Sequence, residues 1–326
     1  MAKTVKNAFD EFMRDSVNLD PQDVPDAKES KDYLIKIISG YDSDDFFHLC
    51  QDFNEEFGSF ARKTKMGILD DIDMMFGISA DGATYEPSNN WNDIKVYGNW
   101  HIKEQKECMD LETGLLNSRS VLNKFKERLG QTYSTSDHPV RDGEAVKLEL
   151  RYDWSFDVVP CFYTVDNFFL IPNGYGGWKK TDPREDRDFI QQVNQKHDGN
   201  VLPLIRLCKK WFEVKKFETP MSYLIETMVA KHCASKDVLC NRIDYNFINF
   251  LIDLPNAVNS QIIDMKKIQG DINDLSKKNR DKISERAKAD QSKVYDIYKA
   301  RNEEKYPEYV INLWGEIFGQ EFPTYG

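Results

Sequence analysis

Two aspartates separated by a single apolar residue, Asp71 and Asp73, constrain this chain more than any other feature. They lie in a stretch that reads as a β-strand, in which alternate side chains share a face, so both carboxylates project together. Like charges side by side are unfavourable unless a cation lies between them, which favours a metal site. Upstream, Gly58 and Ser59 form a turn whose backbone N–H groups and hydroxyl suit a phosphate. A phosphate grip beside paired carboxylates indicates nucleotidyl transfer.

A third carboxylate strengthens this interpretation. A lone Asp-x-Asp is common on solvated strands, and a Gly-Ser turn is a weaker signal still. Asp157, however, interrupts an apolar, β-branched strand over 156–162, where an unpaired charge is strongly disfavoured. A metal shared with Asp71 and Asp73 would compensate it. The alternative is an edge-strand aspartate that reaches water or pairs with Arg151.

Composition limits the class of protein. The chain has 326 residues, 40% apolar and 13% aromatic, which is typical of a globular protein with one large or two moderate domains. The net charge of −11 argues against broad nucleic-acid binding through a basic surface. The N-terminus lacks the apolar core of a signal peptide, no apolar run suits a membrane span, and the six cysteines form no disulfide framework. We expect a soluble, cytoplasmic protein with no membrane segment.

Periodicity divides the chain into a mixed part and a helical part, with the change near residue 180. The predicted strands cover 71–78, 94–102, 145–151, 156–162 and 168–172, with loops over 79–92 and 173–178. The predicted helices cover 5–13, 30–39, 43–57, 104–130, 183–197, 200–215, 219–235, 243–255, 260–302 and 308–318.

Taken together, Gly58-Ser59, Asp71-x-Asp73 and Asp157 in its Asp-Val-Val-Pro strand resemble the polymerase-β-type nucleotidyltransferase superfamily. In detail the chain is similar to the bacterial cGAS/DncV-like nucleotidyltransferases, enzymes that make cyclic oligonucleotide signals in anti-phage (CBASS) defence. Further matching segments are Gly177-Trp178, Thr181-Asp182-Pro183, 204–211, 222–226 and 314–319 with Pro323. The resemblance runs from residue 58 to the end of the chain.

The resemblance implies an α/β (α+β) fold: a polymerase-β-like core with a mixed sheet, and a C-terminal helical lobe that completes a two-lobed cleft. Residues 1–57 would be N-terminal helices that pack on both lobes, 58–180 the catalytic core, and 181–326 the helical domain.

The resemblance also implies an activity, the synthesis of a cyclic oligonucleotide, most simply a cyclic dinucleotide, from nucleoside triphosphates with release of pyrophosphate. Asp71, Asp73 and Asp157 would hold two Mg²⁺ ions, for which Mn²⁺ would substitute. Gly58 and Ser59 would grip the triphosphate.

Four further residues have alternative interpretations. Lys209 and Ser222 match family positions that contact phosphate. A solvated helix charge is the alternative for Lys209, and a helix cap is the alternative for Ser222. Arg62 and Lys63 follow the phosphate grip, and the simplest expectation is that they face solvent.

Two other features concern ligands and partners. His232, Cys233 and Cys240 resemble zinc insertions of animal relatives, but a closed zinc site requires four ligands, so we expect core or surface residues and no structural zinc. The terminal Gly326 suggests conjugation by a ubiquitin-like ligase, as in some members of the family. The other expected partners are nucleoside triphosphates and a downstream effector that binds the product.

Two other function classes remain open. A linear nucleotidyltransferase that extends RNA or places AMP on a protein is the main alternative, although the acidic net charge disfavours RNA. A non-catalytic nucleotide-binding module is the other, and it is disfavoured by the presence of all three carboxylates.

Overall fold

The computed structural model describes residues 2–41, 45–133, 139–150, 154–217 and 222–326. The chain folds into two compact units. The first comprises Met1–Pro21, Arg62–Ile68 and Asp186–Gly326, and the second comprises Gln22–Ala61 and Leu69–Glu185. The N-terminal residues are thus divided between the two units, and a short segment of the first unit interrupts the second. The predicted division at residues 57 and 180 stays a prediction.

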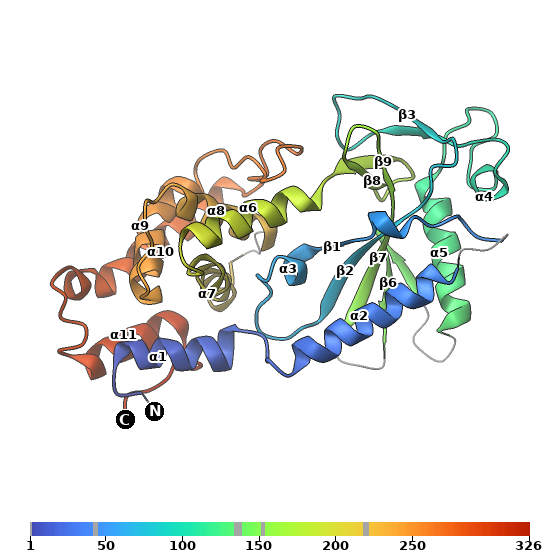
Figure 1. Ribbon diagram of the computed structural model, residues 1–326. Helices are drawn as coiled ribbons and strands as arrows, with labels where there is room; N and C mark the ends of the chain where they lie inside the picture. Colours follow the sequence, from blue (N-terminus) through green and yellow to red (C-terminus); the bar gives the residue numbers. More distant parts are fainter. Residues whose placement is uncertain (1, 42–44, 134–138, 151–153, 218–221) are drawn as a thin grey trace. The chain divides into compact units, whose positions relative to one another are not determined.

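The second unit is built on one mixed sheet (Figure 1). Its strand order is β1-β2-β7-β6-β5, with β8 paired to β7 and β9 paired to β8; β2 and β7 run parallel and the other pairs are antiparallel. The strands are β1 (Glu55–Phe57), β2 (Asp71–Gly77), β5 (Val140–Asp142), β6 (Ala145–Glu149), β7 (Ser155–Tyr163), β8 (Phe169–Pro172) and β9 (Trp178–Thr181). A separate ribbon pairs β3 (Thr84–Glu86) with β4 (Lys95–Tyr97).

The two faces of this sheet differ in polarity. On one face, Ile72 and Met74 of β2 and Phe156 and Val158 of β7 are buried, and α5 (Ser118–Thr132) packs against β6, β7 and β8. The other face is apolar around Met75 and Val159 but polar toward the start of β2. The alternation of strand side chains produces this division. The unit also contains α2 (Asp23–Ser39), the 3₁₀ turn Gln51–Phe53, α3 (Gly58–Ala61) and α4 (Lys103–Lys106).

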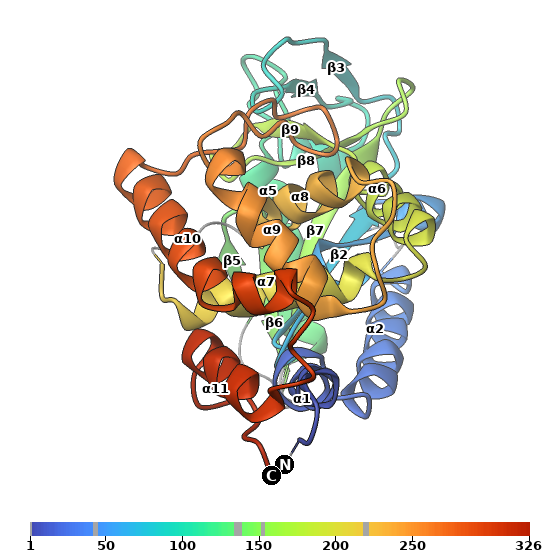
Figure 2. The same ribbon diagram turned by 90° about the vertical axis from the view of Figure 1, so that its left-hand side faces the viewer.

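The first unit is helical and includes both ends of the described chain (Figure 2). The ring of Phe9 in α1 lies 4.9 Å from that of Trp314, and the Ala2 N–H donates to the Thr324 carbonyl at 3.2 Å. This packing explains why the first helix belongs with the last. The helices are α1 (Val5–Phe12), a π-helical turn (Met13–Val17), α6 (Pro183–Lys196), α7 (Val201–Val214), α8 (Ser222–Ala234), α9 (Ile243–Ala257), α10 (Lys277–Lys299) and α11 (Pro307–Phe318).

The predicted mixed α/β architecture with a helical C-terminal part is confirmed. Three predicted helices are wrong. Of the predicted helix 43–57, the described residues 45–57 are mostly irregular around the 3₁₀ turn and β1; 104–130 contains two separate helices, and 260–276 is non-helical before α10. Strands β3 and β9 fall in stretches predicted as loop or left unassigned. None of the helices in the described ranges is both long and apolar enough to cross a membrane.

Candidate active site

One row across the sheet brings the predicted carboxylates together. Asp73 of β2 is in register with Asp157 of β7, which is in register with Lys147 of β6. Asp71 lies two residues before Asp73 in the same strand, so its side chain leaves the same face. The three aspartates are each partly exposed, whereas the residues between them on β2 and β7 are buried. The sequence-predicted triad therefore occupies one end of one sheet face.

Asp157 is not an edge-strand residue. Its strand β7 is hydrogen-bonded to β2 on one side and to β6 on the other, so the edge alternative is wrong. Arg151, the proposed partner, lies outside the described residues. Lys147, which the sequence reasoning did not single out, lies opposite Asp157 instead, and its Nζ is 3.2 Å from Glu149 Oε1. Register across a hairpin determines this pairing, and a single sequence does not reveal register.

The charged side chains on this face act on the pKa of Asp157 in different directions. Burial raises the pKa of Asp157, the neighbouring Asp71 raises it further, and Lys147 acts in the opposite direction. Carboxylates held close together in a partly dry environment favour a divalent cation, which prefers oxygen ligands. Asp71, Asp73 and Asp157 supply carboxylate oxygens from one face of two adjacent strands, and this donor set fits such an ion. Within the described residues, no three His, Cys, Asp or Glu side chains form a ready-made ligand set.

Gly58 makes a close approach to the site. Its φ is +72°, and a Cβ built on it would lie 1.7 Å from Oδ2 of Asp73. Only glycine fits here, because any side chain would collide with the carboxylate. Gly58 opens the short helix α3, so the predicted phosphate grip lies directly beside the β2 carboxylates.

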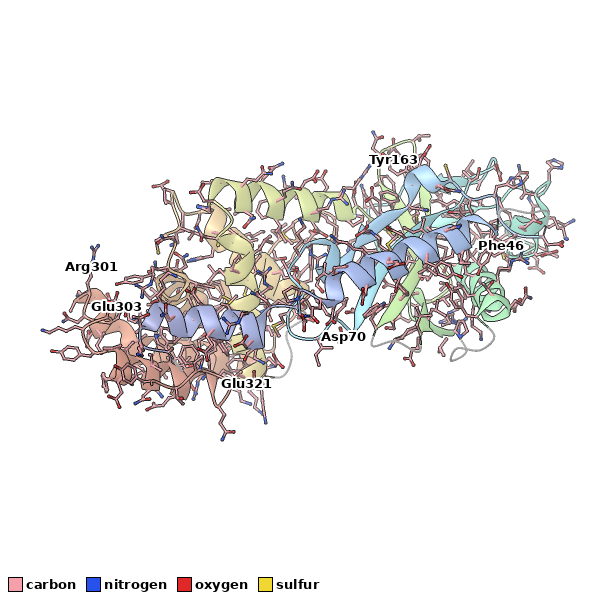
Figure 3. All side chains as sticks on the ribbon, turned by 60° about the horizontal axis from the view of Figure 1, so that its bottom comes forward. Phe46, Asp70, Tyr163, Arg301, Glu303 and Glu321 are labelled. Atoms are coloured by element: carbon pink, nitrogen blue, oxygen red, sulfur yellow. The ribbon has the colours of Figure 1, made fainter. Side chains whose placement is uncertain are left out.

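The starts of β2 and β7 are tied by the residue before β2. Asp70, labelled in Figure 3, accepts hydrogen bonds through its carbonyl from the backbone N–H of Ser155 at 2.9 Å and from the Ser155 hydroxyl at 3.1 Å. Because these contacts fix where the two strands begin, they also fix the levels of Asp71 and Asp157 in the sheet.

The other two predicted phosphate ligands lie in the first unit, and both contact Glu226. Lys209 Nζ is 3.1 Å from Glu226 Oε1, and the Ser222 hydroxyl donates to the same oxygen at 3.1 Å. Lys209 is buried, so the solvated-charge alternative is wrong. Ser222 opens α8, and its hydroxyl is engaged with Glu226, four residues along the same helix.

The expectation that Arg62 faces solvent is also wrong. Its side chain is 9% exposed, and Nε donates to Glu226 Oε2 at 2.9 Å. Lys63 is exposed, as expected. Glu226 lies in the segment 222–226 that the resemblance includes, but the sequence alone predicts no role for it. The available signal was its position four residues after Ser222, the spacing at which helix side chains meet.

The three residues that resemble a zinc insertion, His232, Cys233 and Cys240, lie in different environments. His232 and Cys233 are buried in α8, and Cys240 is exposed. His232 Nδ1 lies 3.1 Å from Asp253 Oδ2, and its ring packs edge-on against Phe250. This arrangement agrees with the predicted core role for His232 and Cys233.

His232 makes stability depend on pH. Burial lowers its pKa from 6.5 to about 4, helped by Lys236 and opposed by Asp253. Between these values the unfolded chain binds the proton and the native chain does not, so stability falls as pH drops below 6.5. We expect a loss of up to about 3 kcal/mol by pH 4, at 1.36 kcal/mol per pKa unit. Urea unfolding of wild type and His232→Gln at pH 7 and 5 measures it. Equal pH slopes would contradict this assignment.

The chain is similar in sequence to a known domain and to a known protein. Residues 112–194 match the model of the Second Messenger Oligonucleotide or Dinucleotide Synthetase domain, a span that includes Asp157 but not Asp71 or Asp73. Over 342 aligned residues the chain is 34% identical to a Bacillus cereus (strain VD146) protein named a probable cyclic nucleotide synthase, covering 100% of this chain and 99% of that one.

Two solved structures share the fold. E. coli MS115-1 CdnC, determined in complex with HORMA-deltaN, matches with a TM-score of 0.70 at 20% identity, and CdnC determined with ATP matches with 0.69 at 19%. Each match covers 98% of both chains. At these identities the likeness establishes the fold.

Proposed function

The chain belongs to the cGAS/DncV-like nucleotidyltransferases and is a nucleotidyltransferase, and on that premise we propose that it condenses nucleoside triphosphates into a cyclic oligonucleotide. A cyclic dinucleotide is the product we favour, with pyrophosphate released at each bond. The observation that carries the proposal is the in-register pair Asp73 and Asp157, with Asp71 on the same face. The name of the Bacillus cereus relative supports the same activity.

In this proposal Asp71, Asp73 and Asp157 hold divalent cations, Mg²⁺ with Mn²⁺ as a substitute. Such ions supply Lewis-acid activation of a hydroxyl and stabilisation of the triphosphate and its leaving group. In this proposal Asp157 also accepts the proton of the attacking hydroxyl, a role that a carboxylate within reach of that hydroxyl can fill.

The phosphates are bound by Gly58 and Ser59, and by Lys209 and Ser222. Support for the first pair is the position of Gly58 beside the Asp73 carboxylate. Support for the second pair is that a buried lysine and a hydroxyl meet at one carboxylate, where donors are already ordered.

The wider context of the enzyme is also a proposal. The product would carry a signal to an effector in anti-phage (CBASS) defence, and the enzyme would act in the cytoplasm, in keeping with six free cysteines. A regulatory partner is suggested by CdnC, a structure solved with HORMA-deltaN. Conjugation through Gly326 remains part of the proposal. Intact-mass analysis with the cognate ligase tests it, and absence of an adduct would dispose of it.

A linear nucleotidyltransferase is the second candidate. It would use the same carboxylates to extend RNA or to place AMP on a protein. The net charge of −11 disfavours a polyanionic RNA substrate but not a protein target.

One assay separates the candidates. Purified protein is incubated with each NTP and with all four, plus Mg²⁺ or Mn²⁺; products are treated with phosphatase and identified by mass spectrometry. A phosphatase-resistant oligonucleotide, absent in Asp71→Ala, is the expected result and identifies the bases. Pyrophosphate release with only phosphatase-sensitive chains would overturn cyclisation in favour of the linear alternative.

A further inference from the structure

We propose that Glu226 is a positioning residue that holds Arg62, Lys209 and Ser222 in the arrangement that receives a nucleoside triphosphate. Glu226 touches no reacting atom in this proposal and acts through the three donors around it. The inference rests on the proposed function, because it assumes that this group of side chains binds the triphosphate.

Both oxygens of the Glu226 carboxylate are occupied. Oε2 accepts from Arg62 Nε at 2.9 Å, while Oε1 accepts from Lys209 Nζ and from the Ser222 hydroxyl, each at 3.1 Å. Glu226 itself is 0% exposed. A buried carboxylate with three donors restrains all of them, since moving Arg62 would leave Oε2 without its donor and moving Lys209 would take the positive charge away from Oε1. Two of the three donors, Lys209 and Ser222, match positions that contact phosphate in the family that the sequence resembles.

The segment that supplies Arg62 is held at three further points. The Thr64 carbonyl accepts from Lys209 Nζ at 2.9 Å, the Lys63 carbonyl accepts from Arg206 Nη1 at 2.7 Å, and the Gly67 N–H donates to a carbonyl of the first unit at 2.9 Å. Lys63 has a φ of 60°, a conformation that non-glycine residues rarely adopt without such support. Segment 62–68 therefore has a defined path, and Arg62 follows α3 directly in the chain.

Among the ion pairs of the described residues around Glu226, the positive charges exceed the negative ones by one. Arg62 and Lys209 carry two positive charges against the single negative charge of Glu226, and the adjacent Lys266–Asp186 ion pair, 3.1 Å apart, is balanced. A buried cation without a full counter-charge favours an anionic ligand. Burial lowers the pKa of Lys209, and the charge of Glu226 opposes that effect. Removing the carboxylate would therefore both release Lys209 and favour its neutral form, which cannot attract phosphate electrostatically.

A matched control exists in the same unit. Asp290 is also 0% exposed, and its Oδ2 accepts from Lys215 Nζ at 2.8 Å, Trp211 Nε1 at 2.9 Å and Arg286 Nε at 3.3 Å. It therefore matches Glu226 in burial and in its number of donors, but its partners lie on or beside α7 and α10. Asp290→Asn measures what losing a buried, triply bonded carboxylate does to the unit as a whole.

The experiment compares Glu226→Gln with Asp290→Asn. Thermal unfolding gives the stability of each variant. Isothermal titration with non-hydrolysable analogues of ATP and GTP, at a temperature where both are folded, gives the dissociation constant. We expect comparable losses of stability, but a dissociation constant at least about tenfold higher only in Glu226→Gln, equivalent to about 1.4 kcal/mol. Equal dissociation constants in the two variants would overturn the positioning role.

A conservative variant keeps the test informative if Glu226→Gln does not fold. Glu226→Asp retains the negative charge, but its side chain is one methylene shorter, so the carboxylate lies farther from its three donors. The fold should survive, while binding of the nucleotide analogues weakens. Wild-type affinity in Glu226→Asp would contradict the proposal. Because binding is measured without turnover, wild type that binds the analogues yet releases no pyrophosphate would overturn the proposed function alone. Wild type that binds neither analogue would overturn both.

Discussion

Replacing Asp73 by alanine should reduce pyrophosphate release by at least about a thousandfold. A thousandfold loss corresponds to about 4 kcal/mol of transition-state stabilisation, within the range that a metal-bound charge cluster supplies. Asp73 is the central member of the row, because it is in register with Asp157 and shares its strand with Asp71. Pyrophosphate release from NTPs with Mg²⁺ measures the effect directly.

The fold should tolerate this change. Asp73 is only partly buried and lies directly opposite another carboxylate, so its removal relieves a like-charge repulsion in the sheet. Thermal unfolding should therefore give a melting temperature close to that of wild type. Glu86→Ala is the control: Glu86 is an exposed strand carboxylate of the same unit, with Lys95 Nζ at 3.3 Å. If Asp73→Ala stays within tenfold of the control, the catalytic assignment is wrong.

The strands that carry the site were predictable because their sequence pattern is strong. In β6 and β7, buried residues are interrupted by single polar ones, Lys147 and Asp157, and such interruptions read directly as one face of a strand. The helix α6 was equally clear, since Asp182-Pro183 provides a start that few other structures use. These local signals agree with the final fold, so no tertiary contact overrides them.

In two of the segments that were wrongly predicted as helices, apolar residues are buried although the backbone around them is not helical. Phe46 is buried in irregular backbone with its ring 5.0 Å from that of Phe125. In the stretch before α10, the buried carboxylate of Asp264 accepts from the backbone N–H groups of Ile268, Gln269 and Gly270. Side-chain acceptors thus replace the helical hydrogen bonds that the spacing of apolar residues had suggested.

The site itself was predictable only within each local segment. Asp71, Asp73 and Asp157 could be chosen from strand pattern and chemistry, but their register could not. The ion pair of Arg62 with Glu226 joins residues 164 positions apart. No periodicity in one sequence encodes such a pair, and for this reason Arg62 was wrongly expected to face solvent.

The second large effect is expected from adding one methyl group at Gly58. In Gly58→Ala the new Cβ would meet Oδ2 of Asp73 at 1.7 Å, a distance at which one of the two groups must move. Displacing a catalytic carboxylate by about 1 Å lowers turnover by about a hundredfold. The positive φ adds strain of about 1 kcal/mol, because alanine disfavours this conformation. We therefore expect a large loss of pyrophosphate release with a small loss of stability.

Gly143→Ala separates the collision from the strain. Gly143 lies in the same unit with a φ of +55°, and a Cβ added there meets nothing within 4 Å. It should show the same small loss of stability in urea unfolding but nearly wild-type turnover. The difference between the two variants therefore isolates the contact with Asp73. If both lose activity equally, backbone strain alone explains the effect. If neither does, Asp73 can move away without loss, and its carboxylate does not need the position that Gly58 leaves open for it.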